Sequence, residues 1–188
     1  MNKKHIITIA GKPGSGKSTT SKRLATTLGY THFSSGDLFR SIGQARGIDV
    51  LATNRLAESE KDIDYLVDQK LREIGQSKDN LVIDSRMAWH WMPYSYRVYL
   101  DLDLKIAAER ILRGMDEARR AAEHVPNNPE EYAEQLKARL DSEARRYFDL
   151  YQVNPYDQNN YDLVIDTATN SIDAVQNIIS ESYRNWLQ

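Results

Sequence analysis

The sequence predicts an α/β domain in which helices cover both faces of one parallel sheet. Short apolar runs rich in β-branched residues alternate along the chain with longer segments of helical periodicity, and this alternation is typical of successive strand–helix–strand units. The runs are almost continuously apolar, as expected of parallel strands that are buried on both sides. A length of 188 residues suits a single domain with its own core.

Each expected element follows from its local pattern. The first strand, residues 6–10, is an isoleucine-rich run that stops at Gly11. A helix over Ser18–Leu28 follows, with Gly29 as its C-terminal stop. Four more strands are expected at Thr31–Phe33, Leu81–Asp84, Arg97–Asp101 and Asp162–Asp166, and further helices at residues 37–74 with breaks at Gly43 and Gly47, then at Leu104–Leu112, Glu130–Tyr151 and Ile172–Leu187. Together they give a five-stranded parallel sheet.

Composition and charge exclude several classes of protein. The net charge of −2 provides no basic field for nucleic acid. The absence of cysteine excludes disulfides, thiolate metal sites and a cysteine nucleophile. No apolar run approaches the ~20 residues of a membrane helix, and the N-terminal run is too short for a signal peptide. We therefore expect a cytoplasmic monomer that binds neither membranes nor nucleic acids.

The segment after the first strand carries the strongest functional signal. Gly11–Ser18 reads GKPGSGKS and satisfies the pattern G-x-x-x-x-G-K-[ST]. Glycines let the backbone turn several N–H groups toward one anion, and the helix that follows adds its positive N-terminal end. Lys17 can reach the β- and γ-phosphates of ATP, and the Ser18 hydroxyl can bind Mg²⁺. A chance match is the alternative, but the strand before the motif and the helix after it argue against one.

The motif predicts a three-layer P-loop NTPase fold with ATP and Mg²⁺ as ligands, and it leaves the acceptor open. The candidate ATP-binding residues are Gly11, Pro13, Gly14, Ser15, Gly16, Lys17, Ser18 and Thr19. Two inserts interrupt the alternating pattern, at about residues 37–75 and about residues 113–130, and these are positions where the mobile parts of a kinase could lie.

The distribution of arginines indicates a phosphate acceptor. An acceptor that is itself a phosphate already has an anionic oxygen, so its site needs positive charge rather than a general base. Arg139, Glu143 and Arg146 share one helical face at i, i+4 and i+7; an exposed ladder of ion pairs is the alternative for them. The candidate catalytic residues are Lys17, Arg86, Arg110, Arg113, Arg139 and Arg146.

Four segments in this order resemble the nucleoside monophosphate kinases, and among them the short archaeal-type branch of the cytidylate kinase family. The segments are Gly11–Ser18, Ser34–Arg40, Asp84–Arg86 and Arg139–Tyr147; residues 161–167 also resemble the final strand of that family. The resemblance implies a kinase that phosphorylates CMP or dCMP at the expense of ATP.

The resemblance also implies residue roles. Ser35, Asp37, Arg40 and Arg86 would contact the acceptor nucleotide, with Arg40 on its phosphate. Arg110 and Arg113 would flank the lid at about residues 113–130, and Arg139 and Arg146 would close on the transferring phosphates. Asp84 would hold Mg²⁺ together with Ser18, and residues 161–167 would lie near the adenine of ATP. Residues 37–75 would form the insert that binds the monophosphate.

Two other functions remain as alternatives to a cytidylate kinase. Met87 stands where bacterial cytidylate kinases have an aspartate that contacts the acceptor, which leaves the preference for base and sugar open. The segment Ser34–Arg40 also resembles adenylate kinases, so an adenylate kinase or a kinase of another small metabolite is a second interpretation. A nucleotide-binding switch is a third interpretation, but residues 77–80 resemble a guanine-binding Asn-Lys-x-Asp element only loosely and lie in the wrong place for one.

The aromatic cluster of Trp89, His90, Trp91 and Tyr94 could stack on a base or pack in the core beneath a loop, and we favour the core position. Tyr147 and Tyr151 are also expected in the core.

Overall fold

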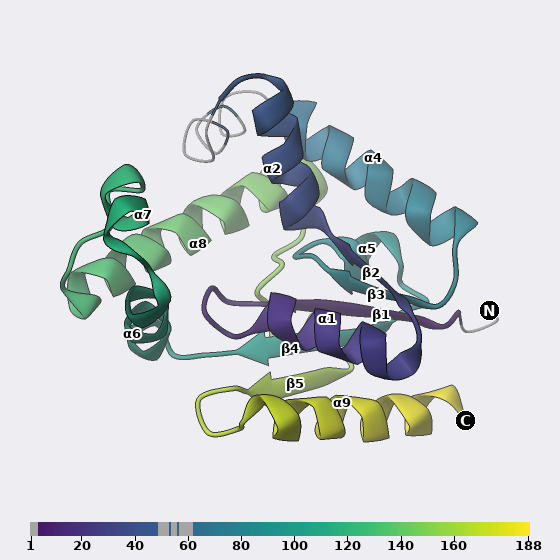
Figure 1. Cartoon of the computed structure of the whole chain (residues 1–188). Coiled ribbons are helices and arrows are strands. Elements are labelled where there is room, and N and C mark those ends of the chain that lie inside the picture. The colour runs from purple at the N-terminus through teal and green to yellow at the C-terminus, as the bar shows by residue number, and fades with distance from the viewer. Residues whose placement is uncertain (1–3, 49–52, 54–55, 57–61) are drawn as a thin grey trace.

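A parallel sheet lies at the centre of the structure, a computed structural model that describes residues 4–48, 53, 56 and 62–188. Within these residues the sheet has five strands in the order β2-β3-β1-β4-β5 (Figure 1). The strands are β1 (Ile6–Gly11), β2 (Thr31–Ser34), β3 (Leu81–Asp84), β4 (Tyr96–Asp101) and β5 (Leu163–Asp166). Every pairing is parallel, which confirms the predicted architecture.

The central strand β1 sets the register of its neighbours. All six of its residues are buried, as its continuous apolar run predicts. Ile9 pairs with Asp84 at the end of β3, and Gly11 pairs with Leu100 near the end of β4. The register therefore brings the carboxyl ends of three strands together beneath the loop that follows β1.

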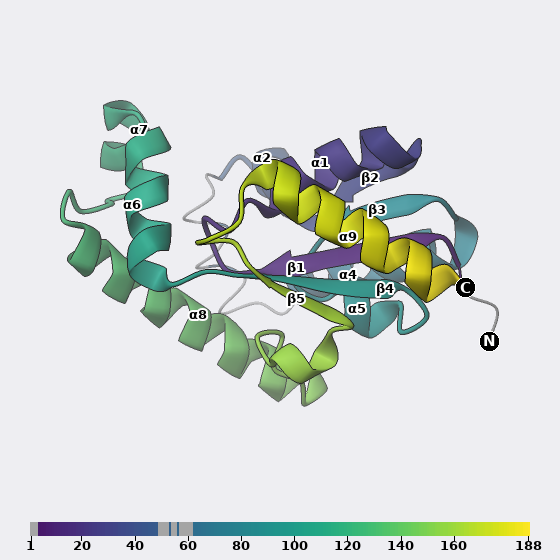
Figure 2. The ribbon, with the colours of Figure 1, turned by 90° about the horizontal axis from the view of Figure 1, so that it is seen from below.

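One face of the sheet is covered by α1 (Lys17–Leu28) and α9 (Ile172–Leu187). Leu24 of α1 and Ile179 of α9 are fully buried against Ile7, Val98 and Leu100 of the sheet. Figure 2 shows α9 lying along the strands, parallel to the sheet surface.

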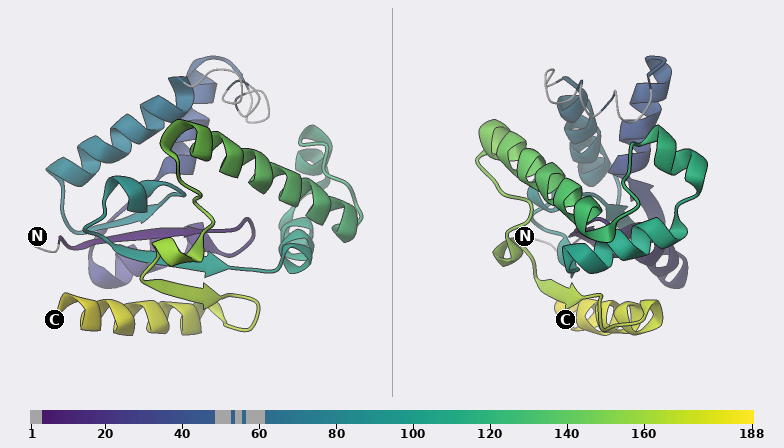
Figure 3. Two further views of the ribbon diagram at one scale, coloured as in Figure 1. Left: turned by 180° about the vertical axis from the view of Figure 1, so that it is seen from behind. Right: turned by 90° about the vertical axis from the view of Figure 1, so that its left-hand side faces the viewer.

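The opposite face is covered by α4 (Asp62–Ser77) and α5 (Ala88–Trp91), with α2 (Ser35–Ala45) packed against α4. Leu71 and Met92 are fully buried on Ile6 and Ile83. Seen from behind, the segment that joins α8 to β5 crosses this same face (Figure 3). Its Tyr156 and Tyr161 pack against Tyr99 and Trp89.

Three helices lie beyond the carboxyl ends of the strands: α6 (Leu104–Gly114), α7 (Glu117–Ala122) and α8 (Pro129–Tyr151), the last followed by the short 3-10 helix η1 (Gln158–Asn160) (Figures 1 and 2). Asn128 caps α8 by accepting hydrogen bonds from the N–H groups of Glu130 and Glu131, and Pro129 occupies the first turn. Leu136 of α8 packs on Ala107 of α6. This packing places α8 across the carboxyl ends of the strands.

The structure corrects some predicted boundaries. Helix α2 begins at Ser35 rather than near Asp37, because the Ser34 side chain caps it by accepting from the N–H of Asp37. Helix α7 lies in the insert at about residues 113–130, for which no helix was predicted. The predicted helical segment 37–74 contains α2 and α4, and its residues 49–52, 54–55 and 57–61 lie outside the described residues. Among the helices described, none combines the length and the apolar character needed to cross a bilayer.

Candidate active site

The loop between β1 and α1 has the backbone of an anion cradle. Gly11, Gly14 and Gly16 have positive φ angles of 145°, 72° and 84°, a region that residues with a Cβ rarely occupy. At Gly11 an added Cβ would lie 2.2 Å from the carbonyl oxygen of Leu100. The close approach of this loop to β4 therefore requires glycine, independently of any ligand.

Lys17 is the first residue of α1, where the positive end of the helix adds to its own charge. Its Nζ donates to the carbonyl oxygen of Lys12 at 2.9 Å. Loss of hydration, together with the nearby positive charge of Arg86, lowers the pKa of Lys17 to about 8. Because a phosphate would stabilise the charged form, this ammonium group is poised to gain from binding one.

Ser18 and Asp84 form the predicted metal-binding pair. The Ser18 hydroxyl donates to Oδ2 of Asp84 at 2.6 Å, although 66 residues separate them. In the described part of the chain no cluster of three or more His, Cys, Asp or Glu residues could hold a metal ion. One hydroxyl and one carboxylate suit Mg²⁺, which takes few protein ligands and completes its shell with water and phosphate oxygens.

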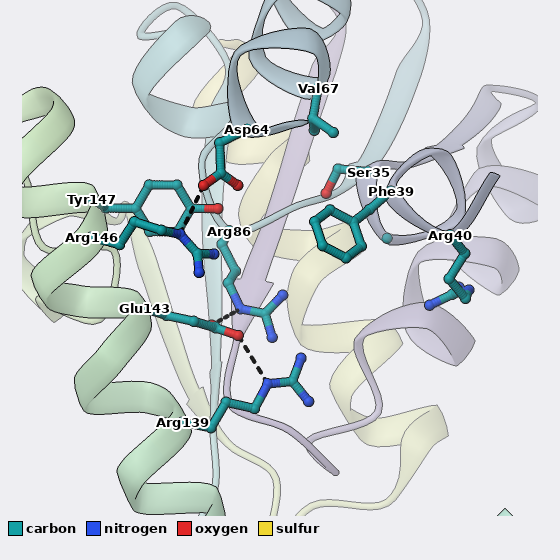
Figure 4. Close-up of a pocket in the computed structure, with 11 residues that line it drawn as sticks. Ser35, Phe39, Arg40, Asp64, Val67, Arg86, Arg139, Glu143, Arg146 and Tyr147 are labelled. Atoms are coloured by element: carbon teal, nitrogen blue, oxygen red, sulfur yellow. Dashed lines mark hydrogen bonds and ion pairs between the residues drawn. The ribbon is translucent and has the colours of Figure 1, made fainter. Parts of the chain in front are cut away.

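Two adjoining pockets lie at the carboxyl ends of the strands. The first, which we call the loop pocket, is bounded by the P-loop, the end of β3, α6 and α8. The second, the helix pocket, lies between α2, α4 and α8 (Figure 4). Both are lined by Ser35, Gly36, Arg40, Arg86 and Arg139. The two pockets are therefore continuous, and three arginines surround their junction.

Glu143 holds two of these arginines. Its Oε2 lies 2.6 Å from Nε of Arg86, and its Oε1 lies 2.9 Å from Nε of Arg139 (Figure 4). The Tyr156 hydroxyl donates to the same carboxylate. Burial alone would raise the pKa of Glu143, but Arg86, Arg139 and Tyr156 together lower it to about 2. Glu143 is 6% exposed, so the alternative of an exposed ladder on α8 is wrong.

Arg146 lies elsewhere than the sequence suggested. Its Nε is 2.8 Å from Oδ2 of Asp64 on α4, and it lines the helix pocket but is not among the residues that line the loop pocket. Burial raises the pKa of Asp64 to about 6, although the charge of Arg146 opposes the shift. Arg146 thus stands on the acceptor side, away from the P-loop, and the prediction that it closes on the transferring phosphates is not supported by this position.

The remaining predicted residues divide into those at the pockets and those beside them. Pro13, Gly14, Lys17, Ser18, Asp84 and Arg110 line the loop pocket. Of the described residues predicted for the site, Gly11, Ser15, Gly16, Thr19, Asp37 and Arg113 are not among the lining residues.

The contacts of Arg110 and Asp37 explain their positions relative to the pockets. The Arg110 guanidinium donates to the carbonyl oxygen of Thr167 at 2.8 Å, so the end of β5 does lie beside the loop pocket. Asp37 pairs with Arg40 at the rim, and both side chains are more than half exposed.

Several residues that line the helix pocket were not predicted for the site, among them Phe39, Asp64, Val67 and Tyr147. Tyr147 was expected in the core but is half-buried at the helix pocket. Asp64 and Val67 carried no sequence signal, because nothing local shows which face of α4 meets α8.

The aromatic cluster after Arg86 is a packing element. Trp89 is buried against Tyr161, with ring centroids 5.7 Å apart, and Trp91 donates from Nε1 to Asp68 at 3.0 Å. Within the described chain, none of its four aromatic side chains lines either pocket. Met87 is 2% exposed and faces the core, so the departure from the family pattern at this position does not reach the pocket surface.

Known proteins resemble this chain in both sequence and fold. The sequence model of a family described as an AAA domain matches residues 7–137. The cytidylate kinase of Haloarcula marismortui is 41% identical over 167 residues, covering 87% of this chain and 81% of the relative. That of Natronomonas pharaonis is 38% identical over 180 residues, covering 94% and 88%. A shikimate kinase from Bacteroides thetaiotaomicron shares the fold alone, with a TM-score of 0.65 at 15% identity over 95% of this chain and 98% of that one. Identity at this level over most of both sequences places the chain in the cytidylate kinase family.

Proposed function

We propose that the protein is a (d)CMP kinase that transfers the γ-phosphoryl group of ATP to the phosphate of CMP or dCMP. The products are ADP and CDP or dCDP. The observation that carries the proposal is the junction of the two pockets, where Arg86 and Arg139 stand between the P-loop and the helix pocket. The similarity of this chain to archaeal cytidylate kinases supports the same acceptor.

The donor would lie in the loop pocket, with its phosphates on backbone N–H groups of residues 14–18 and on Lys17. Ser18 and Asp84 would hold Mg²⁺, which when bound neutralises phosphate charge and orients the β- and γ-phosphates. Arg110 stands across the same pocket and would add charge from the lid side.

The acceptor phosphate would lie at the junction, between Arg40, Arg86 and Arg139. Both terminal nitrogens of Arg86 and Arg139 are directed away from the Nε atoms that bind Glu143 (Figure 4). The guanidinium groups can therefore donate hydrogen bonds to phosphate oxygens while the Glu143 carboxylate fixes their orientation. An acceptor phosphate needs no general base, so charge and alignment are the contributions required from the protein.

The two inserts would close over the substrates. Arg40 and Asp64 of the first insert and Gly114 and Glu123 of the second line the pockets. Approach of the two inserts would exclude water, which would otherwise compete as the acceptor. We propose this division of a single domain into a core, a monophosphate-binding insert and a lid.

A coupled ADP-release assay tests the proposal with Mg·ATP and CMP, dCMP, UMP, AMP or GMP as acceptor. We expect turnover with CMP or dCMP. Replacing Arg139 by Ala should lower kcat/KM about 10²- to 10³-fold, because a charged donor to the transferring group is lost. Arg23 is the matched control: it is half exposed and pairs with Asp173 away from the pockets, so Arg23→Ala should retain activity. Tight ATP binding without turnover of any monophosphate would refute the proposal, and preference for AMP would indicate an adenylate kinase.

A further inference from the structure

The helix pocket has two chemically different ends. At the junction with the loop pocket it carries Arg40, Arg86 and Arg139. Away from the junction it is lined by a second set that the loop pocket lacks: Phe39, Asp64, Val67, Arg146 and Tyr147. An acceptor whose phosphate is held at the junction must therefore extend its base toward this second set.

Asp64 and Arg146 form a polar pair at that far end. Asp64 is 4% exposed, and its Oδ2 lies 2.8 Å from Nε of Arg146. Both atoms are buried, and neither has a hydrogen-bond partner within the described structure. The pair holds itself together by charge while Oδ1 of Asp64 and the terminal nitrogens of Arg146 are not engaged in the contact. In Figure 4 both side chains face the interior of the pocket from different helices, α4 and α8.

We propose that Asp64 and Arg146 select a 4-aminopyrimidine as the acceptor base. The inference rests on the proposed kinase function and names the residues that determine its specificity. A cytosine presents an amino donor at position 4 beside acceptors at N3 and O2. A carboxylate oxygen can accept from the amino group while the neighbouring guanidinium donates to N3 or O2.

Uracil has the opposite pattern along the same edge. Its O4 would face the carboxylate, and its N3–H would face the guanidinium, so two buried groups would lose their partners at once. Sites built on such hydrogen bonds reject an analogue that cannot make them by large factors, commonly 10²-fold or more. Phe39 and Val67 supply apolar surface on which a flat ring can pack.

The surrounding helices hold the pair in register. On α4, Asp68 lies one turn after Asp64 and accepts from the Trp91 indole at 3.0 Å and from the Tyr151 hydroxyl at 2.6 Å. These bonds link α4 to α5 and α8 and so fix the separation across which Asp64 meets Arg146. Asp68 is itself 3% exposed but is not among the described lining residues of either pocket.

The test compares Asp64→Asn with Glu73→Gln in the full chain. An asparagine at position 64 can present its amide N–H₂ to O4 of uracil, so the ratio of kcat/KM for CMP to that for UMP should fall at least 100-fold, with a gain for UMP. Glu73 lies on the same helix and pairs with Lys70, but it is not among the described lining residues of either pocket. Glu73→Gln also removes one carboxylate charge and should leave this ratio within about threefold of the wild type. Titration calorimetry of CMP and UMP should show the same change in relative affinity without any turnover.

Several results would overturn the assignment. An unchanged CMP-to-UMP ratio in a folded Asp64→Asn protein would do so, and so would wild-type preference for GMP, because guanine also offers donors to a carboxylate. If Asp64→Asn fails to fold, Arg146→Lys carries the test. It retains the charge but not the planar fork, and the same ratio should fall at least tenfold. Absence of any wild-type kinase activity would instead refute the proposed function, and calorimetry on CMP and UMP would still decide whether Asp64 selects the base.

Discussion

Replacing Glu143 by Gln tests whether one buried carboxylate organises the junction of the two pockets. The side chain is 6% exposed and binds Arg86, Arg139 and Tyr156. Glutamine preserves its shape and one acceptor oxygen but removes the charge. The variant therefore separates the electrostatic contribution of Glu143 from its contribution to packing.

The expected magnitude follows from the pKa of Glu143, which is lowered from 4.5 to about 2. A lowered carboxyl pKa stabilises the folded state above the unfolded pKa of 4.5, and the benefit is lost as the pH falls toward 2. Each pH unit is worth about 1.4 kcal/mol. At pH 3 the unfolded chain has taken up its proton while folded Glu143 remains ionised, so about 2 kcal/mol has been lost there, and about 3 kcal/mol in total at lower pH.

Urea unfolding at pH 7 and pH 3 measures this difference. The free energy of unfolding of the wild type should fall by about 2 kcal/mol more over this interval than that of Glu143→Gln. At pH 7 the variant should also lose about 100-fold in kcat/KM, because the two guanidinium groups are no longer held in alignment. Tyr156→Phe removes one hydrogen bond to the same carboxylate and should act in the same direction with a smaller loss.

Glu134→Gln on the exposed side of α8 is the matched control, and it should change neither quantity. Equal pH dependence in the wild type and Glu143→Gln would refute the reasoning, because it would mean that the carboxylate gains no net stabilisation from its arginines.

Two further predictions concern the P-loop. Gly11→Ala should prevent stable folding or lower the melting temperature strongly in circular dichroism, because its Cβ would lie 2.2 Å from the Leu100 carbonyl oxygen at a φ of 145°; a normal melting curve would show that the close approach is relieved at little cost. Ser18→Ala should leave the fold intact, since Ser18 is exposed, but should raise the Mg²⁺ concentration needed for half-maximal activity about tenfold or more, and an unchanged Mg²⁺ titration would remove Ser18 from the proposed metal site.

Local patterns were sufficient for most elements of the fold. The buried strand before Gly11 and the glycine-rich loop after it are contiguous in sequence, so their conformation follows from the residues themselves. Strand β3 and helix α9 were predicted with the bounds that the structure has. Helix α7 was not predicted, because its six residues, EARRAA, are too few to show a helical period of apolar residues.

The candidate site was predicted less completely because its parts come from distant segments. The spacing of Arg139, Glu143 and Arg146 placed them on one face of α8, but spacing could not show that Arg86 approaches from the end of β3 and Asp64 from α4. The residue spacing is the same whether such a helix face is exposed or buried, because the burial of Glu143 depends on what packs against it.

The sequence by itself determined the phosphate cradle, the parallel sheet and the chemical character of an arginine-rich phosphate site, because each is encoded by neighbouring residues with a defined period or backbone requirement. The tertiary structure alone decided that Glu143 joins Arg86 to Arg139, that Tyr156 completes this group, and that Arg146 meets Asp64 at the far end of the helix pocket. The physical reason is that ion pairing and burial act through space: they depend on how α4 and α8 pack over the strand ends, and no local pattern specifies that packing.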